Sequence, residues 1–272
     1  SEAQAMAVPA ARNTGDPVAE IMATIHAVAG ITLGDAKRGL VEARLGKRLR
    51  QLDCDLAAYA ELIHRDGDEL IRCLDLLTTN HTAWKREPSH FDDLASRVLP
   101  ALRNRRLRLW CAAAATGEEP WTIALCLART LTLANWDAAL LATDISTKAL
   151  DKARAGRYGE ARVESLTPAD RQLALTVAEP GPPRVYAVAE ALRKVVTFAR
   201  LNLMEDWPMR GPFDVIFCRN VMIYFDRPTQ ERLVNRMAAL LAPGGTLYVG
   251  HAESLSSIRH PLRTLGPATY AA

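Results

Sequence analysis

Residues 107–132 decide the fold, and they read LRLWCAAAATGEEPWTIALCLARTLT. The run 107–113 is short and apolar, which predicts a buried strand. Small residues and Gly117 follow, and from about 118 to 132 the apolar spacing is that of a helix. A strand, a tight turn and a helix in this order make one unit of an α/β fold.

The same alternation continues along the chain. The other expected elements are strands at 138–143, 213–218 and 246–250, a helix from Ser146 and a helix over 229–241. Alternating strands and helices predict a doubly wound, Rossmann-like parallel sheet with helices on both faces. Residues 173–198 instead show β-type alternation around a Pro-Gly-Pro-Pro break, which predicts an inserted antiparallel β-subdomain.

The N-terminal part of the chain has a different pattern. Over residues 18–103 apolar residues recur three and four apart without strand alternation, so we expect a small all-helical N-terminal domain. Residues 1–17 are alanine-rich and aperiodic and are expected to be a disordered lead-in. The α/β domain then occupies 104–272, with the β-subdomain at about 173–198.

Composition excludes several classes of protein. The chain has 272 residues, of which 49% are hydrophobic and 24% charged, as is typical of a soluble globular protein. Its longest apolar runs fall far short of the roughly 20 residues that cross a bilayer. Five widely spaced cysteines in apolar contexts indicate buried thiols in a reducing cytosol, so we expect a cytoplasmic protein without disulfides or a metal site.

Charge is small in total but uneven. The formal net charge is +3, and the basic groups lack interleaved aromatics, which argues against nucleic acid as a partner. Residues 34–50 carry six basic and two acidic groups, a local charge of +4. This stretch predicts a helix with a basic face, which is either a partner-binding surface or an ordinary solvated face.

The first strand-to-helix turn indicates the kind of ligand. No G-x-G-x-x-G or G-x-x-x-x-G-K-[ST] motif occurs, so a cradle for pyrophosphate or triphosphate is missing. A ligand made of adenine, ribose and a charged tail, such as S-adenosylmethionine, suits such a turn. Asp144, at the end of the second strand, would accept both ribose hydroxyls; alternatively, it caps the following helix.

Other polar residues have two interpretations each. Arg219, Asn220 and Tyr224 follow the strand at 213–218, where α/β sheets bind ligands, although a surface arginine and a capping asparagine would look the same. His251 is either a base or a hydrogen-bonded residue at a strand end. The polar loop 78–87 either closes over a site or simply connects two helices.

Several motifs taken together closely resemble the CheR family of chemotaxis receptor methyltransferases, over about residues 20 to 270. They are Thr78-Thr79-Asn80-x-Thr82 with Arg86-Glu87, Thr116-Gly117-Glu118-Glu119-Pro120, Ala142-Thr143-Asp144-Ile145, Asn202-Leu203, Cys218 to Phe225 and Gly250-His251-Ala252-Glu253-Ser254. The resemblance implies a helical domain joined to a class I S-adenosylmethionine-dependent methyltransferase domain with an inserted β-subdomain.

The resemblance also implies roles for individual residues. Those implied to line the cofactor pocket are Asn80, Thr82, Arg86, Glu118, Asp144, Asn202, Leu203, Arg219 and Asn220. Arg86 and Tyr224 are implied to be catalytic and nearest the transferred methyl group. The basic residues implied to face acidic receptor helices are Lys37, Arg38, Arg44, Lys47 and Arg48. The sequence departs from the common family pattern at Ala115, at Trp121-Thr122 and at Trp84-Lys85.

The implied reaction is methyl transfer from S-adenosylmethionine to glutamate carboxylates of the chemoreceptor cytoplasmic domain, leaving S-adenosylhomocysteine. A carboxylate is already ionised at pH 7, so neither a strong base nor a metal is required. The implied partners are the receptor and a tether peptide at its C-terminus, and we expect a monomer. Two alternatives stay open, namely a methyltransferase acting on a small molecule and a non-catalytic S-adenosylmethionine-binding module.

Overall fold

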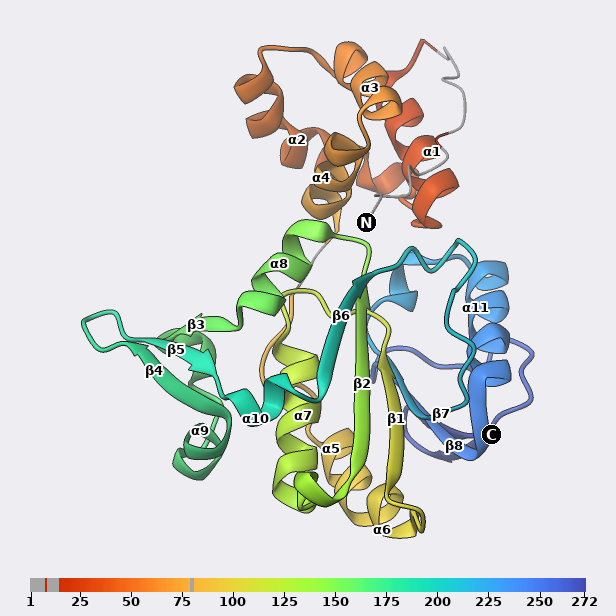
Figure 1. Ribbon diagram of the computed structural model, residues 1–272. Coiled ribbons are helices and arrows are strands. Elements are labelled where there is room, and N and C mark those ends of the chain that lie inside the picture. The colour runs from red at the N-terminus through yellow and green to blue at the C-terminus, as the bar shows by residue number, and fades with distance from the viewer. Residues whose placement is uncertain (1–7, 9–14, 79–80) are drawn as a thin grey trace. The chain divides into compact units, whose positions relative to one another are not determined.

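A computed structural model describes residue 8, residues 15–78 and residues 81–272. The chain divides into two compact units. The first comprises the described part of residues 1–80 together with 202–206 and 224–230, and the second comprises the remainder. Figure 1 shows helices in the first unit and the sheet in the second.

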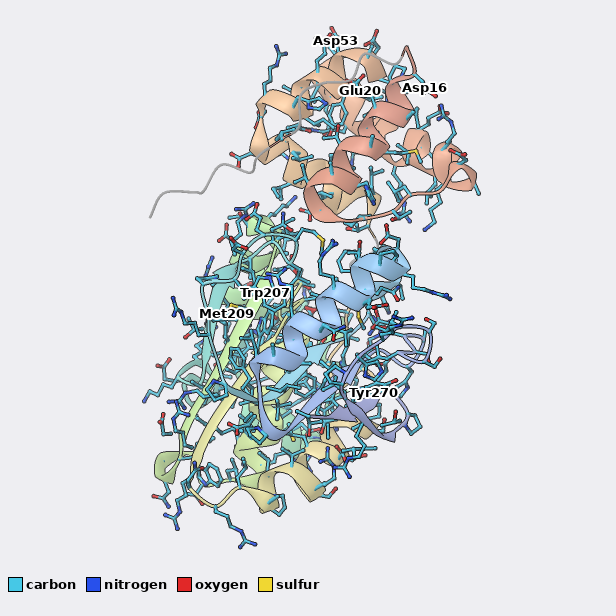
Figure 2. The ribbon with its side chains drawn as sticks, turned by 90° about the vertical axis from the view of Figure 1, so that its right-hand side faces the viewer. Asp16, Glu20, Asp53, Trp207, Met209 and Tyr270 are labelled. Carbon is cyan, nitrogen blue, oxygen red and sulfur yellow. The ribbon has the colours of Figure 1, made fainter. Side chains whose placement is uncertain are left out.

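The first unit is built around four helices. These are α1 (Pro17–Ala29), α2 (Arg38–Leu52), α3 (Leu56–Arg65) and α4 (Gly67–Leu77). The carboxylate of Asp16, labelled in Figure 2, accepts the backbone amide of Ala19 and caps α1. Ile21, Leu45 and Ile63 are fully buried where the apolar faces of the helices meet.

Two later segments complete this unit. Asn202 donates from its side-chain amide to the carbonyl of Val28, over 2.8 Å. Phe225 forms an antiparallel bridge with Ile31. The unit is therefore not one continuous N-terminal segment, since residues distant in sequence form hydrogen bonds with it.

The second unit contains a seven-stranded sheet in the order β6-β2-β1-β7-β8-β10-β9. Its strands are β1 (Arg106–Cys111), β2 (Asp137–Asp144), β6 (Val196–Arg200), β7 (Phe213–Cys218), β8 (Leu241–Val249), β9 (Arg263–Gly266) and β10 (Thr269–Ala271). The first five run parallel, whereas β10 pairs antiparallel with β8 on one side and with β9 on the other. The helices are α5 (Ser89–Asp93), α6 (Leu99–Ala101), α7 (Glu118–Thr130), α8 (Thr147–Ala155), α10 (Glu190–Arg193) and α11 (Arg227–Leu240), of which residues 227–230 are assigned to the first unit.

A small antiparallel sheet stands beside the β6 edge of the main sheet (Figure 1). It has the order β3-β5-β4, with β3 (Arg157–Gly159), β4 (Leu175–Glu179) and β5 (Val185–Val188). Helix α9 (Pro168–Ala174) leads directly into β4. Trp84, Trp121 and Tyr158 are buried in the apolar cluster beneath this sheet.

These features confirm the predicted fold class, a helical part and a doubly wound sheet with an antiparallel insertion. The predicted boundary at residue 103 differs from the structure, because α5 and α6 belong to the second unit. The insertion also differs from the predicted 173–198. It begins with β3 at Arg157, and Val196–Arg200 is a strand of the main sheet that pairs with β2.

Aromatic side chains close the face of the sheet near α11. Trp207, labelled in Figure 2, lies with its ring centroid 4.9 Å from that of Trp110 on β1. The guanidinium carbon of Arg236 lies 3.8 Å from the Trp207 centroid, a cation–π contact. Among the described helices, none combines the length and the apolar character that a membrane span requires.

Gly117 provides a test of the turn between β1 and α7. Its φ is 100°, and an added Cβ would lie 2.7 Å from the Tyr158 hydroxyl and 2.9 Å from Ala153. We expect Gly117→Ala to lower the free energy of unfolding in urea by on the order of 1–3 kcal/mol, since both strain and crowding oppose it. Gly159→Ala, where the space is open, is the control; equal effects would contradict this explanation.

Candidate functional site

The carboxyl ends of the parallel strands define the candidate site. From β1 the chain moves to β2 and β6 on one side, and it returns to β7 and β8 on the other side of β1. Ligands of open α/β sheets bind at such a reversal of strand order. At or just beyond the carboxyl ends of β1, β2, β7 and β8 lie Glu118, Asp144, Arg219 and Glu253.

Asp144 fixes the geometry of the first turn. One carboxylate oxygen accepts the amide of Ala115 and the other accepts that of Ser146, each over 2.9 Å. Ser146, not Asp144, caps α8, because its hydroxyl accepts the amide of Ala149. The alternative role of Asp144 as the helix cap is therefore wrong. That its carboxylate also accepts ribose hydroxyls remains a prediction.

Glu118 is the first residue of α7 and is only 1% exposed. Its carboxylate accepts the Thr116 hydroxyl and pairs with Arg162, whose Nη2 lies 3.2 Å away. The N-terminal position on the helix stabilises the negative charge further. The sequence did not single out Arg162, which comes from the inserted segment and belongs to no recognisable motif.

Arg219 is buried at the end of β7, with 3% of its surface exposed. Its Nε donates to Glu119 over 2.9 Å, and Nη1 donates to Nδ1 of His90 over 3.1 Å. The ring of Phe91 lies beneath its guanidinium, at 5.0 Å from the centroid. The structure thus gives this predicted pocket residue a set of internal contacts, and a contact with the cofactor remains a prediction.

The neighbours of Arg219 have shifted pKa values. Burial raises the pKa of Glu119, although the guanidinium opposes the shift. Burial and the charge of Arg219 lower the pKa of His90 to about 4. His90 is therefore neutral at pH 7. Because the guanidinium of Arg219 can only donate, Nδ1 of His90 is the acceptor and Nε2 of His90 carries the proton.

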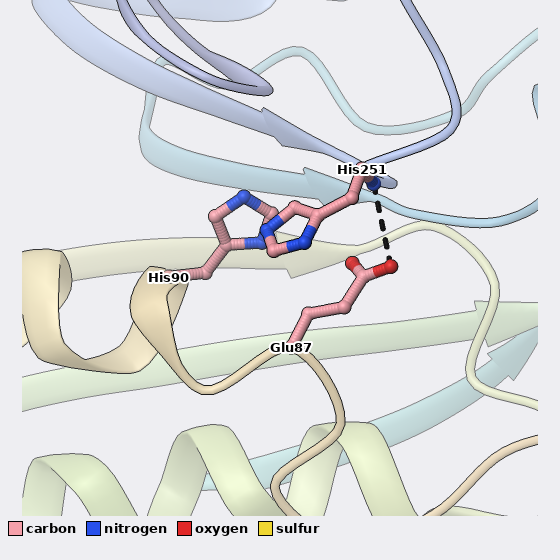
Figure 3. Close-up of side chains that lie close together, drawn as sticks. All are labelled: Glu87, His90 and His251. Carbon is pink, nitrogen blue, oxygen red and sulfur yellow. Dashed lines mark hydrogen bonds between the residues drawn. The ribbon is translucent and has the colours of Figure 1, made fainter.

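Glu87, His90 and His251 form a cluster whose potential ligand atoms lie within 4.8 Å of one another (Figure 3). The cluster already contains a cation, because Nη1 of Arg219 lies 3.7 Å from Oε2 of Glu87 as well as 3.1 Å from His90. His251 donates its backbone amide to Glu87, and its Nε2 lies 3.2 Å from the Ser89 hydroxyl. We therefore interpret the cluster as part of the Arg219 network and not as a metal centre.

Glu253 holds the loop that contains Asn220, a role that its sequence motif does not predict. Its Oε1 accepts the amides of Asn220 and Gly250, over 2.6 and 2.7 Å, and its Oε2 accepts that of Ile223, over 3.1 Å. Burial raises the pKa of this carboxyl, and the backbone amides oppose the shift. Asn220 is in the left-handed region, with φ 61°, so the clamp sustains a conformation that few residues adopt.

Arg86 lies in the loop that precedes α5. Its guanidinium donates to the carbonyl of His81. Both neighbours in the chain, Lys85 and Glu87, have positive φ values of 57° and 53°. Thr82 is half-buried in the same loop, whereas predicted residue Asn80 lies outside the described residues.

The remaining predicted cofactor and catalytic residues belong to the first unit. Asn202 is buried and accepts the amide of Met204 in addition to its bond to Val28. Leu203 is buried, at 8% exposure. Tyr224 is half-buried, and its backbone carbonyl accepts the amide of Thr32 over 2.7 Å.

The basic residues of α2 and the turn before it differ in their contacts. Arg48 makes a two-pronged ion pair with buried Glu69, over 2.8 and 2.6 Å, and this lowers the pKa of Glu69. Arg44 donates to the carbonyl of Leu77, and Arg38 pairs with Asp16. Lys37 and Lys47 are exposed. The structure therefore brings the first three into internal contacts and leaves the two lysines on the surface.

Comparisons with known proteins agree with this geometry. Residues 80–271 match the family profile described as "CheR methyltransferase, SAM binding domain", and residues 18–78 match "CheR methyltransferase, all-alpha domain". A probable chemotaxis protein methyltransferase of Rhizobium etli is 41% identical, over 90% of this chain and 96% of the relative. Chemotaxis protein methyltransferase 2 of Pseudomonas aeruginosa is 41% identical over 94% and 93%, and the Escherichia coli protein is 40% identical over 91% and 87%.

The fold and its ligand edge define an S-adenosylmethionine-dependent methyltransferase. Within that class the chain belongs to the CheR methyltransferase family, and both family domains are present.

The Arg219 network yields a stability prediction. Arg219→Met would leave the carboxylate of Glu119 buried without its cation, so the free energy of unfolding in urea should fall by about 3–5 kcal/mol. Adding Glu119→Gln should recover part of this loss, because the uncompensated charge is removed. A change below about 1 kcal/mol in Arg219→Met would show that the pair is not needed to offset a buried charge.

Proposed function

We propose that this chain transfers methyl groups from S-adenosylmethionine to glutamate side chains of chemoreceptor cytoplasmic helices, forming methyl esters. Membership of the CheR family, together with relatives named chemotaxis protein methyltransferases, carries the proposal. We further propose that it acts in the cytoplasm as a monomer.

The residues at the edge of the sheet fit the cofactor. The turn 112–117 has small side chains, which permit close approach to the backbone. Asp144 would hold ribose hydroxyls, and Glu118, held by Thr116 and Arg162, would offer a second acceptor carboxylate. When bound, S-adenosylmethionine supplies a methyl group on a sulfonium, which a carboxylate oxygen accepts as the carbon–sulfur bond breaks.

The protein's own contribution is alignment and removal of water. A glutamate acceptor is ionised at pH 7, so no group of the chain has to take a proton from it. Arg86 is proposed to bind and orient this carboxylate, since a guanidinium pairs with it through two parallel hydrogen bonds. Tyr224 is proposed to donate a further hydrogen bond. Alignment and desolvation of this kind supply on the order of 7–11 kcal/mol in favourable cases.

Two surfaces are proposed to meet the receptor. The exposed Lys37 and Lys47 would face acidic methylation helices. Arg38, Arg44 and Arg48 would add positive charge to the same surface while their internal contacts hold it in place. A C-terminal tether peptide would add a strand to β4, which is an edge strand of the small sheet and exposes Val177 to 53%.

Incubation with labelled S-adenosylmethionine and a receptor cytoplasmic fragment tests the reaction. Methyl esters would release volatile methanol in alkali, as proposed. Label on a small molecule instead would identify a different acceptor, and cofactor binding without transfer would identify a non-catalytic module.

In this assay Arg86→Ala is expected to reduce turnover by about 100-fold, because loss of alignment by about 1 Å costs a factor of that size. Arg103→Ala, an exposed arginine of the same unit, is the control and should retain activity. A loss within about twofold for Arg86→Ala would remove this residue from the mechanism.

The basic surface predicts a salt-dependent effect. Lys47→Glu should raise the KM for the receptor fragment several-fold at low ionic strength, with kcat unchanged, because it opposes electrostatic attraction. The effect should shrink in about 0.5 M salt, where exposed charges are screened. Arg103→Glu makes the same charge change elsewhere, and an equal rise in KM there would reduce the effect to net charge alone.

A further inference from the structure

The loop that presents Arg86 comprises residues 81–88, and ion pairs hold it on both sides of Arg86. Lys85 forms the first of these pairs. Its side-chain ammonium lies 2.8 Å from Oδ2 of Asp170. Asp170 has no exposed surface, so the partly exposed ammonium of Lys85 pairs with a buried carboxylate.

Asp170 is an ionised anchor whose two carboxylate oxygens both accept hydrogen bonds. Although burial opposes it, hydrogen bonds from Lys85 and Thr167 hold the pKa of this carboxyl below its usual range. Its Oδ1 accepts Nη1 of Arg129 on α7, over 2.8 Å. Its Oδ2 also accepts the amide of Thr167, which completes the capping box of α9. The anchor therefore belongs to the base of the small sheet.

The backbone of the loop is fixed by the same region. The amide of Lys85 donates to the hydroxyl of Thr122 on α7, over 3.0 Å. The carbonyl of Trp84 accepts the Ser165 hydroxyl, over 3.1 Å, and the buried Trp84 ring stands edge-on to Tyr158 at 5.5 Å. Each segment that Lys85 and Trp84 contact is thus packed into the second unit.

The conformation explains why such anchoring is required. Lys85 and Glu87 both have positive φ values, which non-glycine residues adopt only when their surroundings impose them. The ion pair with Arg219 and the hydrogen bond from the backbone amide of His251 hold Glu87 in its conformation. Lys85 is the corresponding constraint on the other side of Arg86.

We propose that Lys85 is a positioning residue for methyl transfer, and that its ion pair with Asp170 sets the direction in which Arg86 points. The inference rests on the proposed function of Arg86. Lys85 itself touches neither substrate nor cofactor in this proposal and acts only through its neighbour in the chain.

The test compares two cations of the same carboxylate. Lys85→Met removes the ion pair that lies on the Arg86 loop, whereas Arg129→Met removes the one on α7. Misplacement of a catalytic group by about 1 Å costs up to 100-fold, so we expect kcat to fall by about 10-fold or more in Lys85→Met. The KM for S-adenosylmethionine should stay within about twofold, and Arg129→Met should keep kcat within about twofold.

Further variants separate positioning from folding. Lys85→Arg restores the charge and should recover most of kcat, and thermal unfolding shows whether Lys85→Met is folded. In an Arg86→Ala background, Lys85→Met should cause no further loss, since residues that act as a unit are not additive.

The outcomes distinguish this inference from the proposed function. If Arg86→Ala abolishes transfer while Lys85→Met and Arg129→Met behave alike, the positioning role is wrong and the function stands. A further 10-fold loss in the Arg86→Ala background would equally overturn it. If Arg86→Ala retains full activity, the role of Arg86 falls and the inference falls with it.

Discussion

The second unit depends on one buried cation. Arg219 follows β7, and its guanidinium joins the first turn of α7 through Glu119, the start of α5 through His90 and the Arg86 loop through Glu87. Taking these charges out of water is costly, and removal of a single partner leaves an uncompensated charge. The network therefore favours only the arrangement in which all three segments meet at the end of β7. It contributes specificity of structure more than net stability, because a well-packed apolar substitute for such a pair is often at least as stable.

The loops around this cation are fixed by carboxylates that accept backbone amides. Asp144 ties the turn after β1 to the turn after β2, and Glu253 ties the loop after β7 to the loop after β8. A ligand at this edge would find its polar contacts in these loops, since the sheet itself is packed with apolar side chains. These carboxylates already satisfy the backbone amides of the loops and hold the loops in one conformation. Little conformational entropy is then lost when a ligand binds, which is what preorganisation means. Some motif residues that resemble ligand-binding residues, Arg219 above all, also hold the loops in place through internal contacts.

Sequence reasoning located the central strands and the fold class because apolar runs and helical spacing are local properties. It placed the domain boundary at 103 and not near 80, since α5 and α6 repeat the spacing of the preceding helices and nothing local shows that they pack on the sheet. The insertion was predicted too short because β3 has three residues and α9 has seven, lengths at which periodicity carries little information. Among the predicted site residues, motifs placed Asp144 at the end of β2 and Glu118 at the start of α7, where the structure has them. The partner Arg162 and the pairing of Arg48 with Glu69 could not be predicted, because they depend on contacts across the fold.

The two ends of the Arg86 loop use ion pairs of opposite sense. At Lys85 the loop supplies the cation and Asp170 the buried acid, whereas at Glu87 the loop supplies the acid and Arg219 the buried cation. Each pair is satisfied by a neighbour of Arg86, so neither draws on the guanidinium of Arg86 itself. Among the described residues its contact with the His81 carbonyl occupies one of five donors. A loop held in this way places an arginine firmly while leaving donors for a carboxylate. Such an arrangement suits a reaction in which the acceptor arrives already ionised and must only be aimed.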